Sequence, residues 1–513
     1  MKLKKILLLI LLLIVFVLEQ PANSETTRII GFIPLDTRPY AYDIPIRLGK
    51  LFGAEILYPP MDSLAFFRET ANCQFIRSWL LQNANDCDAL VVSAEQLIYG
   101  GLIQSREAKI TENERDEALN TLRIIKKAHP NLKIYVSDVL MRNSISAFDE
   151  ESVFWWKKIQ DYSKAYYRTY ADGDMEAKKE LESLTAEIPE KVLNTFLHAR
   201  KFSHEKDLGC IQLVKDGIVD QLIICQEDSA PEGIQRFEQE KLSAVIRENG
   251  LNNKIFMANG AGEAGAELVM RALCPKGSDT GIVWLGENIG FSAMYEDRPF
   301  VENLNTHMSA MNIRENPDSE NVICILPPKR KQSDYVMGFS EGYEEYSYEE
   351  FEAMSRRISD LVKQGKHIFL LDIESANGGN PKLLTAIARQ IPILELYGYS
   401  AWDTASNSLG TLLAQLLACR NENSAENKSY TAERILNDCV YQSIVRQKVS
   451  EKLKNAGVNV WNIDDTKTAE HLISDTFRDN EELLHNIFGV NVPKFQTKLR
   501  WPRLFEIEVI AEE

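Results

Sequence analysis

The sequence predicts an α/β protein built on a mostly parallel sheet. Apolar runs of strand length alternate with segments of helical periodicity, and polar or glycine-rich residues follow most of these runs. Continuous apolar runs are typical of strands that are covered on both faces. Ten runs are predicted to be strands, at residues 29–35, 55–58, 89–93, 133–136, 221–225, 254–258, 281–285, 322–326, 367–371 and 393–397.

Two architectures fit these ten strands. The favoured one is a (β/α)8-like barrel that carries an inserted α/β segment, and the alternative is a pair of doubly wound domains. In the barrel, residues 25–280 form the main domain, residues 281–365 the insertion and residues 366–420 the remainder of the main domain. A helical excursion is predicted at residues 149–207, and a small α+β appendix at residues 421–513.

The amino-terminal segment has the pattern of a signal peptide. Three lysines precede an apolar run at residues 6–18, and small residues follow it. This run is shorter than the ~20 residues that cross a bilayer. We therefore expect cleavage after residue 24 and a secreted or extracytoplasmic protein, with a retained anchor as the alternative.

Charge and motifs exclude several classes of function. The net charge of −17 disfavours binding to nucleic acid or to an anionic membrane surface. The sequence contains no HExxH, GxSxG, Walker or strand-linked GxGxxG motif. It therefore lacks the motifs of zinc proteases, esterases with a nucleophile elbow, P-loop enzymes and dinucleotide-binding enzymes. A small-molecule or glycan substrate is the expected partner.

Candidate functional residues follow the predicted strands. The carboxyl ends of parallel strands are where loops converge on a ligand, and carboxylates gathered there repel one another unless a ligand or cation compensates. The residues expected to hold a substrate are Asp36, Arg38, Glu95, Arg142, Asn259, Glu263, Glu374, Asn377, Trp402 and Asn407.

The adjacent acidic pair Glu227 and Asp228 is the candidate catalytic group. Two carboxyl groups at a strand end can divide the work of glycoside cleavage, one as acid or base and the other as a stabilising group. Neighbouring aromatic residues favour a sugar-binding cleft. The leading hypothesis is therefore an exported hydrolase of glycoside-hydrolase type that acts on a glycan or oligosaccharide.

Two alternatives remain open. The same carboxylates could bind a divalent metal in a metal-dependent hydrolase or lyase, although no metal ligand can be assigned from the sequence. The protein could instead bind carbohydrate or cell-wall fragments without catalysis. No cofactor is otherwise predicted.

Several motifs resemble those of a bacterial family catalogued as domain of unknown function 4127. They occur in the family's order, as PLDTRP, VVSAEQLIYGGLIQSR, QEDSAPEG, NGAGEAG, EDRPF, DIESANGGN and YGYSAWDTASNSLG. The resemblance implies that these loops form one shared site. The sequence departs from the usual residues at Glu227, Gly262, Asn380 and Asp403, which is typical of a divergent member.

Overall fold

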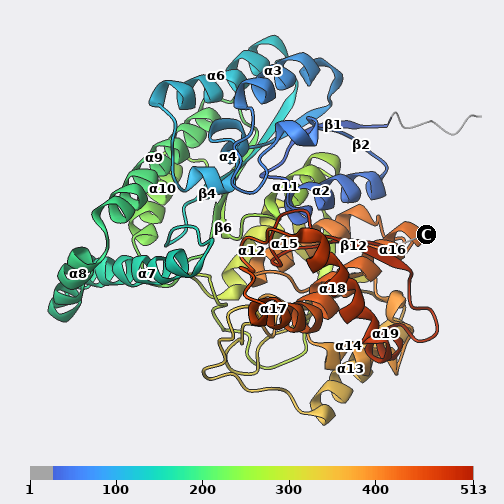
Figure 1. The fold of residues 1–513 in the computed structure, drawn as a ribbon. Helices are drawn as coiled ribbons and strands as arrows, with labels where there is room; N and C mark the ends of the chain where they lie inside the picture. The colour runs from blue at the N-terminus through green and yellow to red at the C-terminus, as the bar shows by residue number, and fades with distance from the viewer. Residues whose placement is uncertain (1–26, 512–513) are drawn as a thin grey trace, which may run out of the picture.

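The computed structural model describes residues 27–511 and contains a six-stranded parallel sheet in its amino-terminal half (Figure 1). The strand order is β2-β1-β3-β4-β5-β6. Every paired neighbour runs parallel, as the apolar runs predicted. The strands are β1 (Ile29–Ile33), β2 (Glu55–Leu57), β3 (Ala89–Ser93), β4 (Lys133–Leu140), β5 (Gln221–Gln226) and β6 (Ile255–Asn259).

A second parallel sheet has five strands in the order β11-β10-β9-β7-β8. The predicted mostly parallel α/β fold is therefore confirmed, and its strands form two sheets, as in the second of the two expected architectures. Strand pairing within residues 27–511 does not close either sheet into a ring. The strands are β7 (Ser278–Trp284), β8 (Ile313–Glu315), β9 (Asn321–Leu326), β10 (His367–Asp372) and β11 (Gly398–Ser400).

Two details of the second sheet differ from the sequence prediction. The segment 281–365 supplies most of β7 and all of β8 and β9, which belong to the same sheet as β10 and β11. The predicted strand at 393–397 was wrong, because Pro392 precedes a 3-10 turn at Ile393–Glu395. Extended pairing with β10 begins only after this turn.

Helices from three parts of the chain form a layer between the two sheets. They are α2 (Pro39–Phe52), α11 (Ala264–Leu273) and α15 (Ala405–Ala418). Helix α11 packs against β3 and β4, α15 packs against β10 and β11, and the two helices contact each other. Their close approach requires Gly410, because an added Cβ would lie 2.4 Å from Glu263 Cγ.

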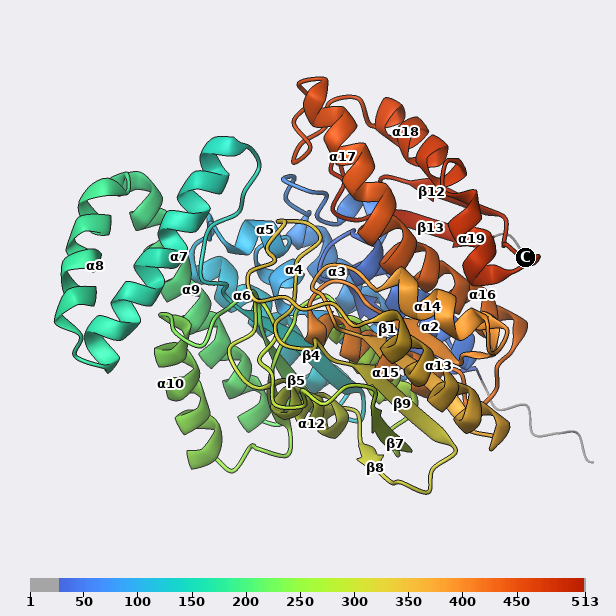
Figure 2. The same ribbon diagram turned by 90° about the horizontal axis from the view of Figure 1, so that it is seen from below.

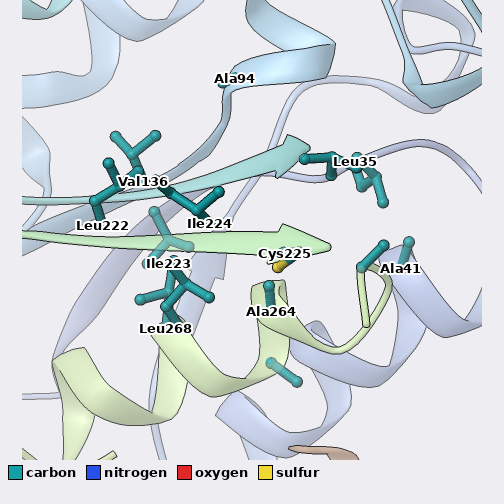
Figure 3. Close-up of a cluster of buried hydrophobic side chains, with 14 of the residues drawn as sticks. Leu35, Ala41, Ala94, Val136, Leu222, Ile223, Ile224, Cys225, Ala264 and Leu268 are labelled. Carbon is teal, nitrogen blue, oxygen red and sulfur yellow. The ribbon is translucent and has the colours of Figure 1, made fainter. Parts of the chain in front are cut away.

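The core of the first sheet is apolar on both faces. Figure 3 shows Ile223 and Cys225 of β5 on the side that faces Ala264 and Leu268 of α11. Leu222 of β5 points to the other side and is equally buried. Alternate side chains of a strand point to opposite faces, so continuous burial confirms that helices cover both faces of this sheet.

A long helical segment projects from the outer face of the first sheet (Figures 1 and 2). It consists of α7 (Glu150–Ala171), α8 (Met175–Glu187) and α9 (Glu190–Lys215), and Asp149 begins it with a capping box. The other helices of this half are α3 (Cys73–Asn83), α4 (Ala94–Ile98), α5 (Leu102–Ser105), α6 (Glu112–Ala128) and α10 (Gln235–Glu248). Among the described residues, no helix has the length and apolar character needed to span a membrane. The predicted signal peptide lies outside this range.

The carboxyl-terminal segment is α+β and returns to the loop that follows β1. Trp501 Nε1 donates a hydrogen bond to Thr37 Oγ1 at 2.9 Å, and Arg500 forms an ion pair with Asp43 at 2.9 Å. These contacts bring residues 500–506 to the carboxyl end of the first sheet.

The remaining helices are α12 (Phe300–Ala310), α13 (Tyr348–Lys363), α14 (Pro381–Ala388), α16 (Ala425–Arg434), the π-helix Ile435–Val445, α17 (Arg446–Asn455), α18 (Thr466–Arg478) and α19 (Glu481–Phe488). The final hairpin pairs β12 (Phe495–Lys498) with β13 (Glu508–Ala511).

Candidate active site

A cavity of about 170 Å³ lies where the carboxyl ends of both sheets converge. This volume is similar to that of a protein cavity that holds one six-membered ring. Loops after β1, β4, β5, β6, β10 and β11 contribute to its wall, together with residues of the carboxyl-terminal segment. The charged lining residues are Asp36, Arg38, Arg106, Arg142, Glu227, Asp228, Asp403 and Arg503, and the aromatic ones are Phe148, Trp156, Tyr295, Trp461, Trp501 and Phe505.

Three arginines of the cavity are paired with carboxylates. Arg38 Nε lies 2.9 Å from Asp36 Oδ1, Arg106 forms a two-point ion pair with Glu227, and Arg142 is paired with Asp228. Glu227 and Asp228 contact different arginines, although they are neighbours in sequence.

The ion pair with Arg106 keeps Glu227 charged. Burial alone would raise the pKa of Glu227, but the guanidinium groups of Arg106 and Arg142 lower it below its ordinary value. A general acid must hold a proton at the working pH. The structure therefore favours Glu227 as an ionised carboxylate and does not favour it as the proton donor.

Asp403 has the opposite environment in the same cavity. Burial raises its pKa, the Thr404 amide and Arg38 oppose that rise, and the negative charge of Glu227 adds to it. Its Oδ1 accepts hydrogen bonds from the Thr404 amide at 2.5 Å and from Asn407 Nδ2 at 2.6 Å. These bonds fix the orientation of the carboxyl group.

Seven of the residues predicted from sequence line this one cavity. They are Asp36, Arg38, Arg142, Glu227, Asp228, Asn377 and Asn407. They come from the segments that follow five different strands, which agrees with the rule that strand ends gather functional groups. The positive φ of 61° at Asn377 turns its chain toward the cavity, and its amide hydrogen-bonds to the Asp403 carbonyl at 2.7 Å.

Glu95 was expected to hold substrate, but it is buried in an ion cluster away from the cavity. Lys206 Nζ lies 2.7 Å from Glu95 Oε1 and 3.0 Å from Asp207 Oδ1, and it also pairs with Asp138. All four side chains are essentially inaccessible to solvent. Burial raises the pKa of both Glu95 and Asp138 to about 7, although Lys206 opposes the rise.

Asn259 and Glu263 lie in a buried polar network behind the cavity wall. Asn259 donates a hydrogen bond to Ser229 and accepts one from Asn303, both at 3.0 Å. Glu263 Oε2 accepts the Ala261 amide at 2.9 Å, and burial raises its pKa to about 8. These residues support the loop at 260–262, which lines the cavity, but they do not line it themselves.

Glu374 and Trp402 also do not line the cavity. Glu374 accepts hydrogen bonds from Tyr343 and Asn380, and burial raises its pKa to about 7. Trp402 packs edge-on between Tyr40 and Phe505 at ring-centre distances of 5.3 Å and 5.2 Å. The two residues shape the loops around the cavity from behind.

Sequence reasoning missed several residues of the site, above all Arg106 and Arg503. Arg106 ends the motif VVSAEQLIYGGLIQSR, so the motif itself contained the signal. Arg503 and Trp501 follow no parallel strand and reach the site only because the chain returns over residues 500–506. No local pattern indicated this return.

The described residues show no group of three or more His, Cys, Asp and Glu side chains arranged to hold a metal ion. The carboxylates of the cavity are instead paired with guanidinium groups, as with Asp36, Glu227 and Asp228. An arginine neighbour competes directly with a cation for the same oxygen atoms. The structure thus gives no support to the metal-dependent alternative at these residues.

Comparison with known proteins identifies the family of the chain. No curated protein matches it. The model of one family, described as protein of unknown function (DUF4127), matches residues 30–510, which is nearly the whole chain and includes both sheets and the carboxyl-terminal segment. The chain therefore belongs to the DUF4127 family.

Proposed function

We propose that the protein is an exported hydrolase of glycoside-hydrolase type that acts on a glycan or oligosaccharide. One observation carries the proposal. Glu227 and Asp403 line the same cavity, and their surroundings shift the pKa of Glu227 down and that of Asp403 up. A pair of carboxyl groups with opposite pKa shifts is the arrangement that glycoside cleavage uses.

The two carboxyl groups have complementary roles in this proposal. Asp403 donates its proton to the glycosidic oxygen as the bond to the sugar carbon breaks, so that the leaving group departs as a neutral alcohol. Glu227 remains ionised and compensates the positive charge that develops on the sugar ring. Water then adds its hydroxyl group to the sugar carbon and gives its remaining proton to the Asp403 carboxylate, which restores the acid. Asp228 and Asp36 hold Arg142 and Arg38 in place through their ion pairs.

The aromatic lining supports a sugar as the substrate. Trp156, Trp461 and Trp501 line the cavity beside the charged groups. The apolar face of a sugar ring packs against an aromatic ring, while its hydroxyl groups require hydrogen-bonding partners. Asn377 and Asn407 provide such partners in the same cavity.

Substitution of Glu227 by glutamine tests the proposal. We expect the purified wild-type protein to release reducing ends from at least one member of a panel of bacterial and plant oligosaccharides. E227Q should lower kcat by ~10²-fold or more, because an amide cannot compensate the developing positive charge. Product release is measured by chromatography of the reaction mixture.

A control is E176Q, which changes an exposed carboxyl group on α8 that does not line the cavity. We expect E176Q to keep kcat within about twofold of the wild-type value, provided that circular dichroism shows it to be folded. Full turnover by folded E227Q would contradict the role of Glu227. Binding of oligosaccharide by the wild type without any product would instead favour a carbohydrate-binding protein.

A further inference from the structure

We propose that the ligand of this cavity is an acidic oligosaccharide and that Arg503 binds one of its anionic groups. The inference rests on the proposed function for the choice of a sugar chain, but its charge argument is independent of catalysis. Carboxylate and sulfate substituents share the chemistry that a guanidinium group recognises.

The pairing of the cavity's arginines supports an anionic ligand. Four arginines line it, and three of them are paired with Asp36, Glu227 and Asp228. The fourth lining carboxyl group, Asp403, accepts hydrogen bonds from the Thr404 amide and from Asn407 instead. Arg503 is therefore the lining arginine without a paired carboxylate among the described residues, and a bound anion would supply that partner.

Arg503 has no ion-pair partner within 4.0 Å among residues 27–511. Its guanidinium lies over the rings of Trp501 and Phe505, at 4.9 Å and 5.1 Å from their centres. Burial, followed by the charge of Arg38, lowers the pKa of Arg503 to about 9, although the carboxyl groups of Glu506 and Asp36 oppose the fall. A positive group with a depressed pKa gains stability from a nearby anion.

Arg142 offers a second unsatisfied donor to the same ligand. Its buried Nε has no hydrogen-bond partner among the described residues, although its terminal nitrogen is paired with Asp228. Buried donors are almost always satisfied in folded proteins, so the exceptions identify places where a ligand or water completes the bonding. Arg142 and Arg503 line one cavity and could contact one acidic sugar residue.

A second cavity indicates that the ligand is longer than one sugar. It has a volume of about 230 Å³ and shares Trp156 and Tyr295 with the first cavity. Lys157 and Lys164 of α7 lie in its wall, and none of the described residues that line it is acidic. Figure 2 shows α7 beside the loops at the carboxyl ends of the strands. A second acid group of the chain would meet these lysines.

Local and overall charge play different parts in this recognition. The protein as a whole carries a net charge of −17 and does not attract polyanions over long distances. Arg142 and Arg503 line the first cavity, where partial burial strengthens a contact with an anion, and Lys157 and Lys164 lie in the wall of the second. The arrangement therefore selects short acidic chains that enter the cavities.

Three trisaccharide probes of one length test the inference by isothermal titration calorimetry with the whole protein. They are a uronic acid trimer, the same trimer with its carboxyl groups reduced to alcohols, and a sulfated neutral trimer. We expect the wild type to bind at least one of the two acidic probes about tenfold more tightly than the reduced trimer. The better acidic probe distinguishes a carboxylate from a sulfate.

Variants assign the preference to its residues. R503M should remove the preference for acidic probes, and R503K should retain part of it. K164M should lower the affinity for the acidic trimer severalfold and leave the affinity for an acidic monosaccharide unchanged. Lys164 lies on the surface of α7, so K164M tests the second cavity even if R503M fails to fold. Equal affinity for acidic and reduced trimers, binding of none of the three, or full acid preference in folded R503M would overturn the inference.

The same experiment separates the inference from the proposed function. Acid-dependent binding without product release would sustain the inference and contradict the hydrolase. Product release from the reduced trimer as efficiently as from the acidic ones would sustain the hydrolase and contradict the inference.

Discussion

Replacement of Lys206 by methionine is expected to lower the free energy of unfolding by ~3–5 kcal/mol, because it leaves buried carboxylates without their cation. Lys206 Nζ contacts Glu95, Asp138 and Asp207, and it donates a further hydrogen bond to the Val139 carbonyl at 2.9 Å. Methionine retains the apolar volume of the side chain and removes only the charge. Urea unfolding followed by circular dichroism measures the change.

The control for this substitution is K201M on the same helix, where Lys201 is exposed. Exposed lysines contribute little to stability, so K201M should change it by less than ~0.5 kcal/mol. D138N added to K206M should recover part of the loss, because it removes one of the uncompensated charges. A K206M protein as stable as the wild type would show that the cluster does not hold ionised carboxylates.

Replacement of Asp403 by asparagine is expected to lower kcat by ~10²–10⁴-fold, since the amide cannot donate a proton to the leaving group. Asparagine keeps an oxygen that can accept the bonds from Thr404 and Asn407, so substrate binding should change little. The loss should therefore appear in kcat and not in the dissociation constant. Steady-state kinetics and calorimetry on the same oligosaccharide separate the two quantities.

The pH dependence of the wild type provides the check on this assignment. Asp403 must be protonated, so kcat/KM falls as the pH rises through its raised pKa. Glu227 must be ionised, so kcat/KM falls again as the pH drops through its lowered pKa.

A substrate whose leaving group needs no protonation, such as a glycosyl fluoride, should restore most of the activity of D403N. Failure of that substrate to rescue a folded D403N would contradict the acid role.

The parts of the site that follow strands could be predicted from sequence. Asp36, Arg142 and Asp228 come directly after apolar runs, and parallel strands bring such positions to one edge. The same reasoning predicted the mostly parallel fold, because burial on both faces leaves continuous apolar runs. It did not distinguish one ring from two sheets, since strand order depends on pairing between distant segments.

The remaining parts depend on partners that are distant in sequence. Glu95 follows a buried strand, as Asp36 does. It nevertheless pairs with Lys206, which is 111 residues away on α9. Glu227 lies next to Asp228 in the sequence, yet its pKa is lowered by Arg106, which is 121 residues away. Arg503 reaches the cavity through the returning carboxyl-terminal segment. Such pairs set the charge of a carboxyl group, and no local pattern encodes them.

The most direct test of the central claim is a crystal structure of D403N with the acidic trisaccharide that the wild type binds best. The claim is that Glu227, Asp403 and Arg503 face one ligand in one cavity. It predicts density for the sugar chain between the two sheets, with a glycosidic oxygen next to residue 403 and an acid group on Arg503. A trisaccharide bound elsewhere on the protein, with this cavity holding only water, would contradict the claim.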